Sequence, residues 1–136
     1  SKKEIGLICE KYKNVKIFVD TKNPDLSQFQ NCIIKLNEKE KNNSKNLNDN
    51  CETIVTLGSE GCIYNNEIFN AKKVDVYDVC GAGDVFLATL VARWLETKNM
   101  KESIRVANNC ASLSVMKLGC YTLKRREYEN CINSKD

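Results

Sequence analysis

The chain has 136 residues, which suggests one domain or a piece of one, and 42% hydrophobic residues are enough to bury a core. A net charge of +3 and a pI of about 8.4 are too mild for a dedicated nucleic-acid binder, and no apolar run approaches the roughly 18–20 residues of a membrane span. The chain contains no His, which excludes Ser-His and Cys-His catalysis.

Eight cysteines are spread along the chain, and no two of them are spaced as C-x-x-C. Without His, a zinc site would have to be assembled from distant cysteines alone, so we expect none. Several cysteines lie in apolar stretches, such as Cys32 before Ile33 and Ile34, where Cys behaves as a small hydrophobic residue. We therefore expect reduced cysteines and a cytoplasmic protein.

Apolar periodicity predicts the secondary structure in chain order. Short apolar runs predict strands, at residues 15–19, 32–36, 53–57, 62–64, 67–71 and 74–77. Helical spacing or a polar helix start predicts helices, at residues 4–12, 37–41, 86–95, 101–117 and 127–132. Asn65 and Asn66 tolerate the positive φ of a tight turn, so the fourth and fifth strands should form a hairpin.

A polar, Asn-rich tract at residues 42–51 interrupts this pattern. Such a composition offers little to bury, so we interpret the tract as a disordered or looped insertion. Because long surface insertions cost little loop entropy, we expect residues 42–50 to be dispensable for the fold.

Strands that alternate with helices predict an α/β fold with a parallel sheet. Ligands of such sheets bind beyond the carboxyl ends of the strands. Polar clusters follow the strands at residues 20–22, 37–40, 56–61 and 78–84, so we expect these clusters to converge on one edge.

The strongest chemical signal is the segment 78–84, D-V-C-G-A-G-D, which opens the most apolar helix. A glycine turn at a helix N-terminus exposes backbone N–H groups and the positive end of the helix dipole, and it can therefore bind an anion. The missing Cβ atoms let a phosphate approach closely. The final Asp84 is either a first-turn Asp favoured by the dipole or a base held beside a phosphate, and the pattern alone leaves both interpretations open.

The D-x-x-G-A-G-D pattern resembles the second signature of the ribokinase-like (PfkB) carbohydrate kinases. The resemblance implies that Gly81, Ala82 and Gly83 form an anion hole for the transferring phosphoryl group. It also implies that Asp84 is the general base on the acceptor hydroxyl and that Asp78 orders the loop. The implied fold is a three-layer α/β sandwich with a mainly parallel central sheet, of which residues 1–136 are the C-terminal, ATP-binding and catalytic part.

Other segments resemble the family in the same order along the chain. Thr56, Gly58 and Gly61 match V-T-x-G-x-x-G, which implies contact with the nucleotide phosphates, although a strand that ends in a glycine hairpin gives the same pattern. Asn37 and Glu40 match N-x-x-E, which implies that they order Mg²⁺ through water. Taken alone, N-x-x-E also describes the start of a surface helix.

Lys22 and Asn108 complete the candidate ATP-binding residues. Lys22 resembles the Lys of V-D-P-K, where it would offset phosphate charge or remain a solvated lysine, and Asn108 lies where a polar residue borders the adenine. The Y-D-V start of the signature resembles the heptose-7-phosphate kinases, with Cys80 in place of their Thr. The resemblance covers residues 15–123.

The implied reaction transfers the γ-phosphoryl group of ATP, with Mg²⁺, to a hydroxyl of a small-molecule sugar or sugar phosphate. Heptose 7-phosphate is the first candidate acceptor, and ribose, fructose phosphate and nucleosides are the alternatives. The family's N-terminal half supplies most sugar contacts and a lid, so we expect the isolated chain to be inactive. A homodimer formed through that lid is an open alternative. The rival class is a non-catalytic nucleotide-binding fragment. A Rossmann dinucleotide-binding domain is not expected, because the sequence contains no G-x-G-x-x-G.

Overall fold

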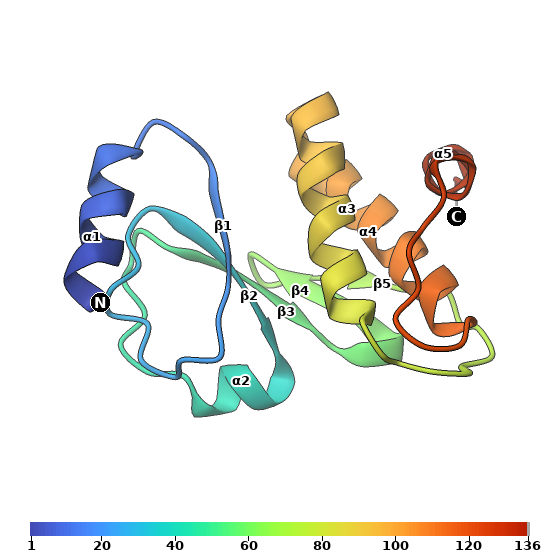
Figure 1. The fold of residues 1–136 in the computed structure, drawn as a ribbon, viewed down its shortest axis with the longest axis horizontal. Helices are drawn as coiled ribbons and strands as arrows, with labels where there is room; N and C mark the ends of the chain where they lie inside the picture. Colours follow the sequence, from blue (N-terminus) through green and yellow to red (C-terminus); the bar gives the residue numbers. More distant parts are fainter. Residues whose placement is uncertain (136) are drawn as a thin grey trace. The chain divides into compact units, whose positions relative to one another are not determined.

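The computed structural model describes Ser1–Lys135, and the chain divides into two compact units. The first unit consists of Ser1–Leu57 and Ile63–Glu67, and the second consists of Gly58–Cys62 and the chain from Ile68 onward (Figure 1). Within the described residues, no helix combines the length and the apolar character that a membrane span requires.

One five-stranded sheet has its strands in chain order, and the sheet is mixed. Its strands are β1 (Ile17–Asp20), β2 (Cys32–Asn37), β3 (Glu52–Thr56), β4 (Gly61–Tyr64) and β5 (Glu67–Asn70). β1, β2 and β3 are parallel, with Ile17 opposite Cys32 and Ile33 opposite Glu52. Asn65 and Asn66 have φ values of 49° and 63°, so the predicted Asn-Asn hairpin between β4 and β5 is confirmed.

In the first unit, β2 is the central parallel strand and is buried from Cys32 to Leu36. Strands covered on both faces read as continuous apolar runs, which explains why β2 lacks alternation. Its one charged residue, Lys35, is 5% exposed and donates to Asp20 in β1 at 3.1 Å. Because the ion pair joins register partners, the buried charge is neutralised inside the sheet.

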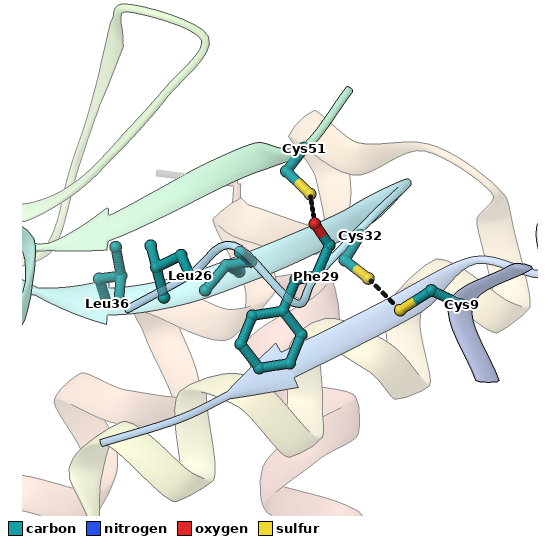
Figure 2. Close-up of a cluster of buried hydrophobic side chains, with 7 residues drawn as sticks. Cys9, Leu26, Phe29, Cys32, Leu36 and Cys51 are labelled. Atoms are coloured by element: carbon teal, nitrogen blue, oxygen red, sulfur yellow. Dashed lines mark hydrogen bonds between the residues drawn. The ribbon is translucent and has the colours of Figure 1, made fainter. Parts of the chain in front are cut away.

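Helix α1 (Lys2–Lys11) and the loop before β2 belong to the same apolar cluster (Figure 2). Its buried members are Cys9, Leu26, Phe29, Cys32, Ile34, Leu36 and Cys51. Ser1 caps the helix through a capping box with Glu4, which satisfies the first backbone N–H groups. The predicted helix at residues 4–12 is therefore confirmed, and it begins slightly earlier.

The Asn-rich tract at residues 42–51 is mostly an ordered loop of the first unit rather than a disordered segment, and its contacts oppose the expectation that residues 42–50 are dispensable. Its first two residues complete α2 (Glu38–Asn43), and the rest is a loop. Lys45 N–H donates to Pro24 O at 2.8 Å, and Leu26 N–H donates to Lys45 O at 3.0 Å. The side chain of Asn48 donates to Ser27 O at 3.0 Å and to Phe29 O at 2.6 Å. Composition hides this role because the amide side chains bind backbone oxygens rather than contribute apolar surface.

The second unit contains three helices and the short 3₁₀ turn Gly58–Glu60. α3 (Ala82–Thr97) packs along α4 (Met100–Val115), whose Ile104, Val106 and Cys110 are fully buried. α5 (Arg125–Asn133) is tied to α4 by Arg105, which donates to Ile132 O at 2.7 Å and to Ser134 O. The three predicted helices are thus confirmed within a few residues at their ends.

The strand expected at residues 74–77 is absent, and that expectation was wrong. The N–H groups of Tyr77 and Asp78 both donate to Val115 O, at 2.7 and 3.0 Å, so a helix end takes the hydrogen bonds that a strand would have used. Val76 and Tyr77 are 52% and 70% exposed. The alternating pattern therefore marks an extended segment that crosses the end of α4.

Cys80 and Cys120 are joined by a disulfide, with their Cα atoms 5.1 Å apart. The expectation that the cysteines are reduced was wrong for this pair, because the two residues are 40 positions apart and only the fold brings them together. The other six cysteines are free and buried, as expected of small hydrophobic residues.

We predict that Asn48→Ala in the full-length protein lowers the free energy of unfolding by roughly 1–3 kcal/mol, because the backbone carbonyls of Ser27 and Phe29 both lose a hydrogen-bond donor. Urea unfolding followed by circular dichroism measures the change. Asn42→Ala is the matched control, since Asn42 is exposed in the same tract, and it should change stability by less than about 0.5 kcal/mol. Equal stability of the two variants would show that the tract is not held by Asn48.

Candidate functional site

The glycine turn before α3 has the geometry of an anion-binding helix start. Gly81 is the N-cap with φ 73° and ψ 2°, a left-handed conformation that glycine adopts without strain. It offers no side chain to cap the helix, and Ala82 N–H donates to Val79 O at 3.2 Å. The N–H groups of Gly83 and Asp84, in the first turn, have no intrahelical acceptor by the geometry of a helix. An anion at this end would therefore gain two N–H donors and the helix dipole.

Asp84 lies in the first turn of α3 with an exposed side chain. Asp84 thus belongs to the same first turn as the N–H groups that favour an anion, and the residue is exposed to solvent. A bound phosphate and a carboxylate would repel each other there unless a proton or cation came between them. This placement suits a base that takes up a proton as a phosphoryl group is transferred.

The Asp78 side chain accepts hydrogen bonds that hold the glycine turn in place. Its Oδ1 accepts from Cys80 N–H at 2.9 Å, and its Oδ2 accepts from Gly119 N–H at 3.0 Å. One carboxylate therefore holds two turns, the one that starts α3 and the one that follows α4. A Cβ atom on Gly81 would lie 3.4 Å from the Cβ and Sγ atoms of Cys120, so the two turns are in contact. The geometry supports the loop-ordering role expected of Asp78.

A second polar site lies in the first unit, where a cavity of about 400 Å³ opens beyond the end of β2. Three of the candidate residues line it together: Lys22, Asn37 and Glu40. Lys39 and Asn43 also line the cavity, and motif matching assigned neither of them a role. The sequence signal for them was their position on α2, one helical turn apart, which places both on the same side of the helix.

Asn37 and Glu40 form the capping box of α2. Asn37 Oδ1 accepts from Glu40 N–H and Glu40 Oε2 accepts from Asn37 N–H, both at 2.8 Å. Lys22 donates to the other carboxylate oxygen, Oε1. Burial of the carboxyl opposes its ionisation, but the hydrogen bonds from Lys22 and from the Asn37 N–H outweigh burial and lower the pKa of Glu40. Glu40 is therefore charged at neutral pH.

These residues fit Mg²⁺ only as a minor part of its coordination shell. Each oxygen of Glu40 already accepts a hydrogen bond and retains one lone pair, and the Asn37 side-chain oxygen is used in the cap. Among Ser1–Lys135 no cluster of three or more His, Cys, Asp or Glu side chains could hold a metal. Mg²⁺ commonly binds through one or two carboxylates, substrate phosphates and water, and Glu40 meets that modest requirement.

Of the other candidate ATP-binding residues, Thr56 and Gly61 make close contacts within the fold and Gly58 does not. Thr56 Oγ1 donates to Leu36 O at 3.3 Å across β2 and β3. Gly61 has φ 106°, and a Cβ atom there would lie 2.0 Å from Phe69 O, so Gly61 is required by the backbone of β5 itself. Gly58, with φ 59°, has open space at its Cβ position. Of these residues, Gly58 retains the most room for a ligand.

Asn108 is 5% exposed, and its Nδ2 donates to Phe69 O at 3.1 Å. This hydrogen bond ties α4 to β5 inside the second unit. The placement gives no support to the expected contact with adenine.

We predict that Asp78→Ala lowers the free energy of unfolding by about 1.5–3 kcal/mol, the scale of hydrogen bonds to a charged group. The measurement is made in reducing buffer, so that the Cys80–Cys120 bond does not substitute for the lost contacts. Asp75→Ala is the control, because Asp75 is exposed three residues earlier and should be nearly silent. An Asp78→Ala protein as stable as this control would remove Asp78 from the account of the turn.

Comparison with known proteins gives one consistent family. The chain matches the family described as pfkB family carbohydrate kinase over residues 8–126. Bifunctional protein HldE of Campylobacter concisus is 33% identical over 148 residues, which cover 93% of this chain and 31% of that protein. Bifunctional protein HldE of Nitratiruptor is 34% identical over 149 residues, which cover 93% of this chain and 32% of that protein.

Solved structures show the fold. The chain resembles Arabidopsis thaliana ribokinase complexed with ribose and ATP, with TM-score 0.76, 20% identity, and coverage of 99% of this chain and 54% of that one. Phosphofructokinase-2 from Escherichia coli has TM-score 0.76 at 15% identity, with coverage of 98% and 52%.

The chain spans about a third of the length of these curated relatives, since the matches cover 31% and 32% of the two HldE proteins. The expected ribokinase-like α/β fold is confirmed by the solved structures. Because the family match extends over most of the sequence, the chain belongs to the pfkB family of carbohydrate kinases.

Proposed function

We propose that the full-length protein transfers the γ-phosphoryl group of ATP to a hydroxyl of a sugar phosphate, with heptose 7-phosphate as the first candidate. The observation that carries the proposal is the start of α3, which has no side-chain cap and has the exposed Asp84 in its first turn. Phosphoryl transfer depends mainly on positioning and on stabilisation of charge, and such a turn supplies both.

Asp84 acts as the general base. Its carboxylate accepts the proton of the acceptor hydroxyl as that oxygen attacks the phosphorus, and the bond to the leaving ADP oxygen breaks. The turn of Gly81, Ala82 and Gly83 brings backbone N–H groups to the transferring phosphoryl oxygens, and Asp78 keeps that turn in place. Hydrogen bonds that strengthen as charge develops lower the barrier.

The first unit would contribute to the nucleotide phosphates. Lys22 offsets phosphate charge when ATP is bound, and Glu40, with Asn37 through water, would hold Mg²⁺, which neutralises phosphate charge. Thr56 and Gly58 remain proposed neighbours of the phosphates. Gly61 and Asn108 would act on the nucleotide indirectly, because both contact the backbone of Phe69 in β5.

The acceptor is proposed from the resemblance and from the curated relatives. The Y-D-V start of the signature resembles heptose-7-phosphate kinases, and the curated relatives are bifunctional HldE proteins. The chain itself spans about a third of those relatives, so we propose that sugar contacts come from the remaining protein, that a dimer forms there, and that the isolated chain is inactive. We also propose a cytoplasmic location. Ribose, fructose phosphate and nucleosides are the alternative acceptors, since one scaffold serves many substrates.

We predict that the full-length protein consumes ATP with heptose 7-phosphate at least tenfold better, in kcat/KM, than with ribose, fructose 6-phosphate or adenosine, which is about 1.4 kcal/mol of discrimination.

Asp84→Asn should lower kcat by about 10²–10⁴ while ATP affinity changes little, because only the base is lost. Coupled ADP detection and calorimetry measure the two quantities.

Asp75→Asn is the matched control, as it removes a nearby exposed carboxylate and should leave kcat unchanged. Near-normal turnover of Asp84→Asn would exclude Asp84 as the base. A tenfold preference for ribose or adenosine would overturn the heptose assignment and leave the kinase standing. ATP binding without turnover of any acceptor would favour a non-catalytic nucleotide-binding protein.

A further inference from the structure

Cys80 and Cys120 differ from every other cysteine of the chain. Both lie at the surface and are bonded to each other, whereas the remaining six cysteines are buried and free. Solutes reach exposed sulfur atoms first, so any thiol or disulfide reagent meets this pair before the others.

The position of the pair links it to the candidate site. Cys80 directly precedes Gly81, the N-cap of α3, and Cys120 directly follows Gly119, whose N–H is held by Asp78. The disulfide therefore joins the same two turns that the Asp78 carboxylate joins. A covalent link and an ionic hydrogen-bond clamp act on one short stretch of backbone.

A second pair of cysteines lies close together without a bond. The Sγ atoms of Cys9 and Cys32 lie 3.6 Å apart in the core of the first unit, and both residues are free (Figure 2). Burial, together with the neighbouring Cys9, raises the pKa of Cys32 to about 12, so its reactive thiolate is scarce at neutral pH. Cys80 and Cys120, in contrast, are both exposed to solvent.

We propose that Cys80 and Cys120 form a reversible thiol–disulfide site that fixes the glycine turn, so that oxidation strengthens and reduction weakens the phosphoryl-binding end of α3. The functional half of this inference rests on the proposed kinase activity. The oxidant is a small-molecule disulfide such as oxidised glutathione. One thiolate attacks it and releases a thiol, the second thiolate then displaces another, and two S–H bonds become one S–S bond as the oxidant takes up two electrons and two protons.

The direction of the effect follows from pre-organisation. In the bonded state Gly81 packs against Cys120, and the first-turn N–H groups are already at the open end of the helix. Reduction leaves the Asp78 carboxylate and the hydrogen bonds from Tyr77 and Asp78 N–H to Val115 O as the links to the end of α4 and the turn after it. A looser turn must be ordered when ATP binds, so kcat/KM for ATP should fall by about three- to tenfold without being abolished.

The test uses the full-length protein equilibrated in oxidised glutathione or in dithiothreitol. Alkylation and peptide mass spectrometry measure the state of each cysteine, hydrogen exchange measures the order of the turn, and ATP kinetics measure the effect. We expect Cys80 and Cys120 to be bonded only in glutathione disulfide, with slower exchange over residues 78–84 and a higher kcat/KM. Cys9 and Cys32 should resist alkylation until the protein is denatured.

The double variant Cys80→Ser/Cys120→Ser should behave as the reduced wild type in both buffers, because it can form neither the bond nor a mixed disulfide with glutathione at these positions and touches no proposed ligand contact. Cys51→Ser is the matched control and should keep the full redox response, since a hydroxyl can replace the thiol that donates to Phe29 O. Cys80 and Cys120 that alkylate separately in glutathione disulfide would overturn the site. A bond without any change in exchange or kcat/KM, or with a lower kcat/KM, would overturn its proposed effect.

The same experiment separates this inference from the proposed function. If no form of the protein turns over ATP while the bond still forms and slows exchange at the turn, the kinase proposal fails and the thiol–disulfide site is supported. If turnover is normal and the bond never forms, the site fails and the kinase proposal is supported.

Discussion

The carboxylate of Asp78 determines the shape of the site in the second unit, because its two oxygens bind Cys80 N–H and Gly119 N–H at 2.9 and 3.0 Å. Without a strand at residues 74–77, the extended segment before α3 is held mainly by this carboxylate and by the hydrogen bonds from Tyr77 and Asp78 N–H to Val115 O. A glycine turn can expose N–H groups to a ligand only if something else fixes its path. Asp78 supplies that constraint, and Cys80 places a covalent bond next to it.

Charged side chains in the first unit are also paired with each other. Lys35 pairs with Asp20 within the sheet, and Lys22 pairs with Glu40 at the cavity beyond β2. Glu40 caps α2 through its carboxylate. Burial opposes ionisation of this carboxyl, but the hydrogen bonds that it accepts from Lys22 and Asn37 N–H outweigh burial and lower the pKa of Glu40. A residue that secures its own helix can face a ligand with little movement, which suits a group that borders phosphates.

Local patterns predicted what local physics decides. The apolar run of β2, the Asn65-Asn66 turn and the glycine start of α3 each depend on neighbours in the sequence, and each forms as expected. Family resemblance added the roles of the glycine turn and of Asp84, which no periodicity could provide.

The features that the sequence did not reveal depend on partners far along the chain. Asn48 in the polar tract binds backbone oxygens about 20 residues away, and Cys80 meets Cys120 after 40 residues. The 74–77 segment alternates like a strand, but its neighbour is the end of α4. Asn108 donates to Phe69 O, 39 residues away, a contact that no local pattern reveals, and its place beside the nucleotide stays a prediction.

The most direct measurement of the central claim is a crystal structure of the full-length protein with ADP, aluminium fluoride and the acceptor sugar. Aluminium fluoride imitates the phosphoryl group in transfer. The account predicts that it binds at the first-turn N–H groups of α3, with an oxygen of Asp84 about 2.6–3.2 Å from the acceptor hydroxyl. Binding elsewhere, or an Asp84 carboxylate turned away from that hydroxyl, would contradict the claim that this turn carries out phosphoryl transfer.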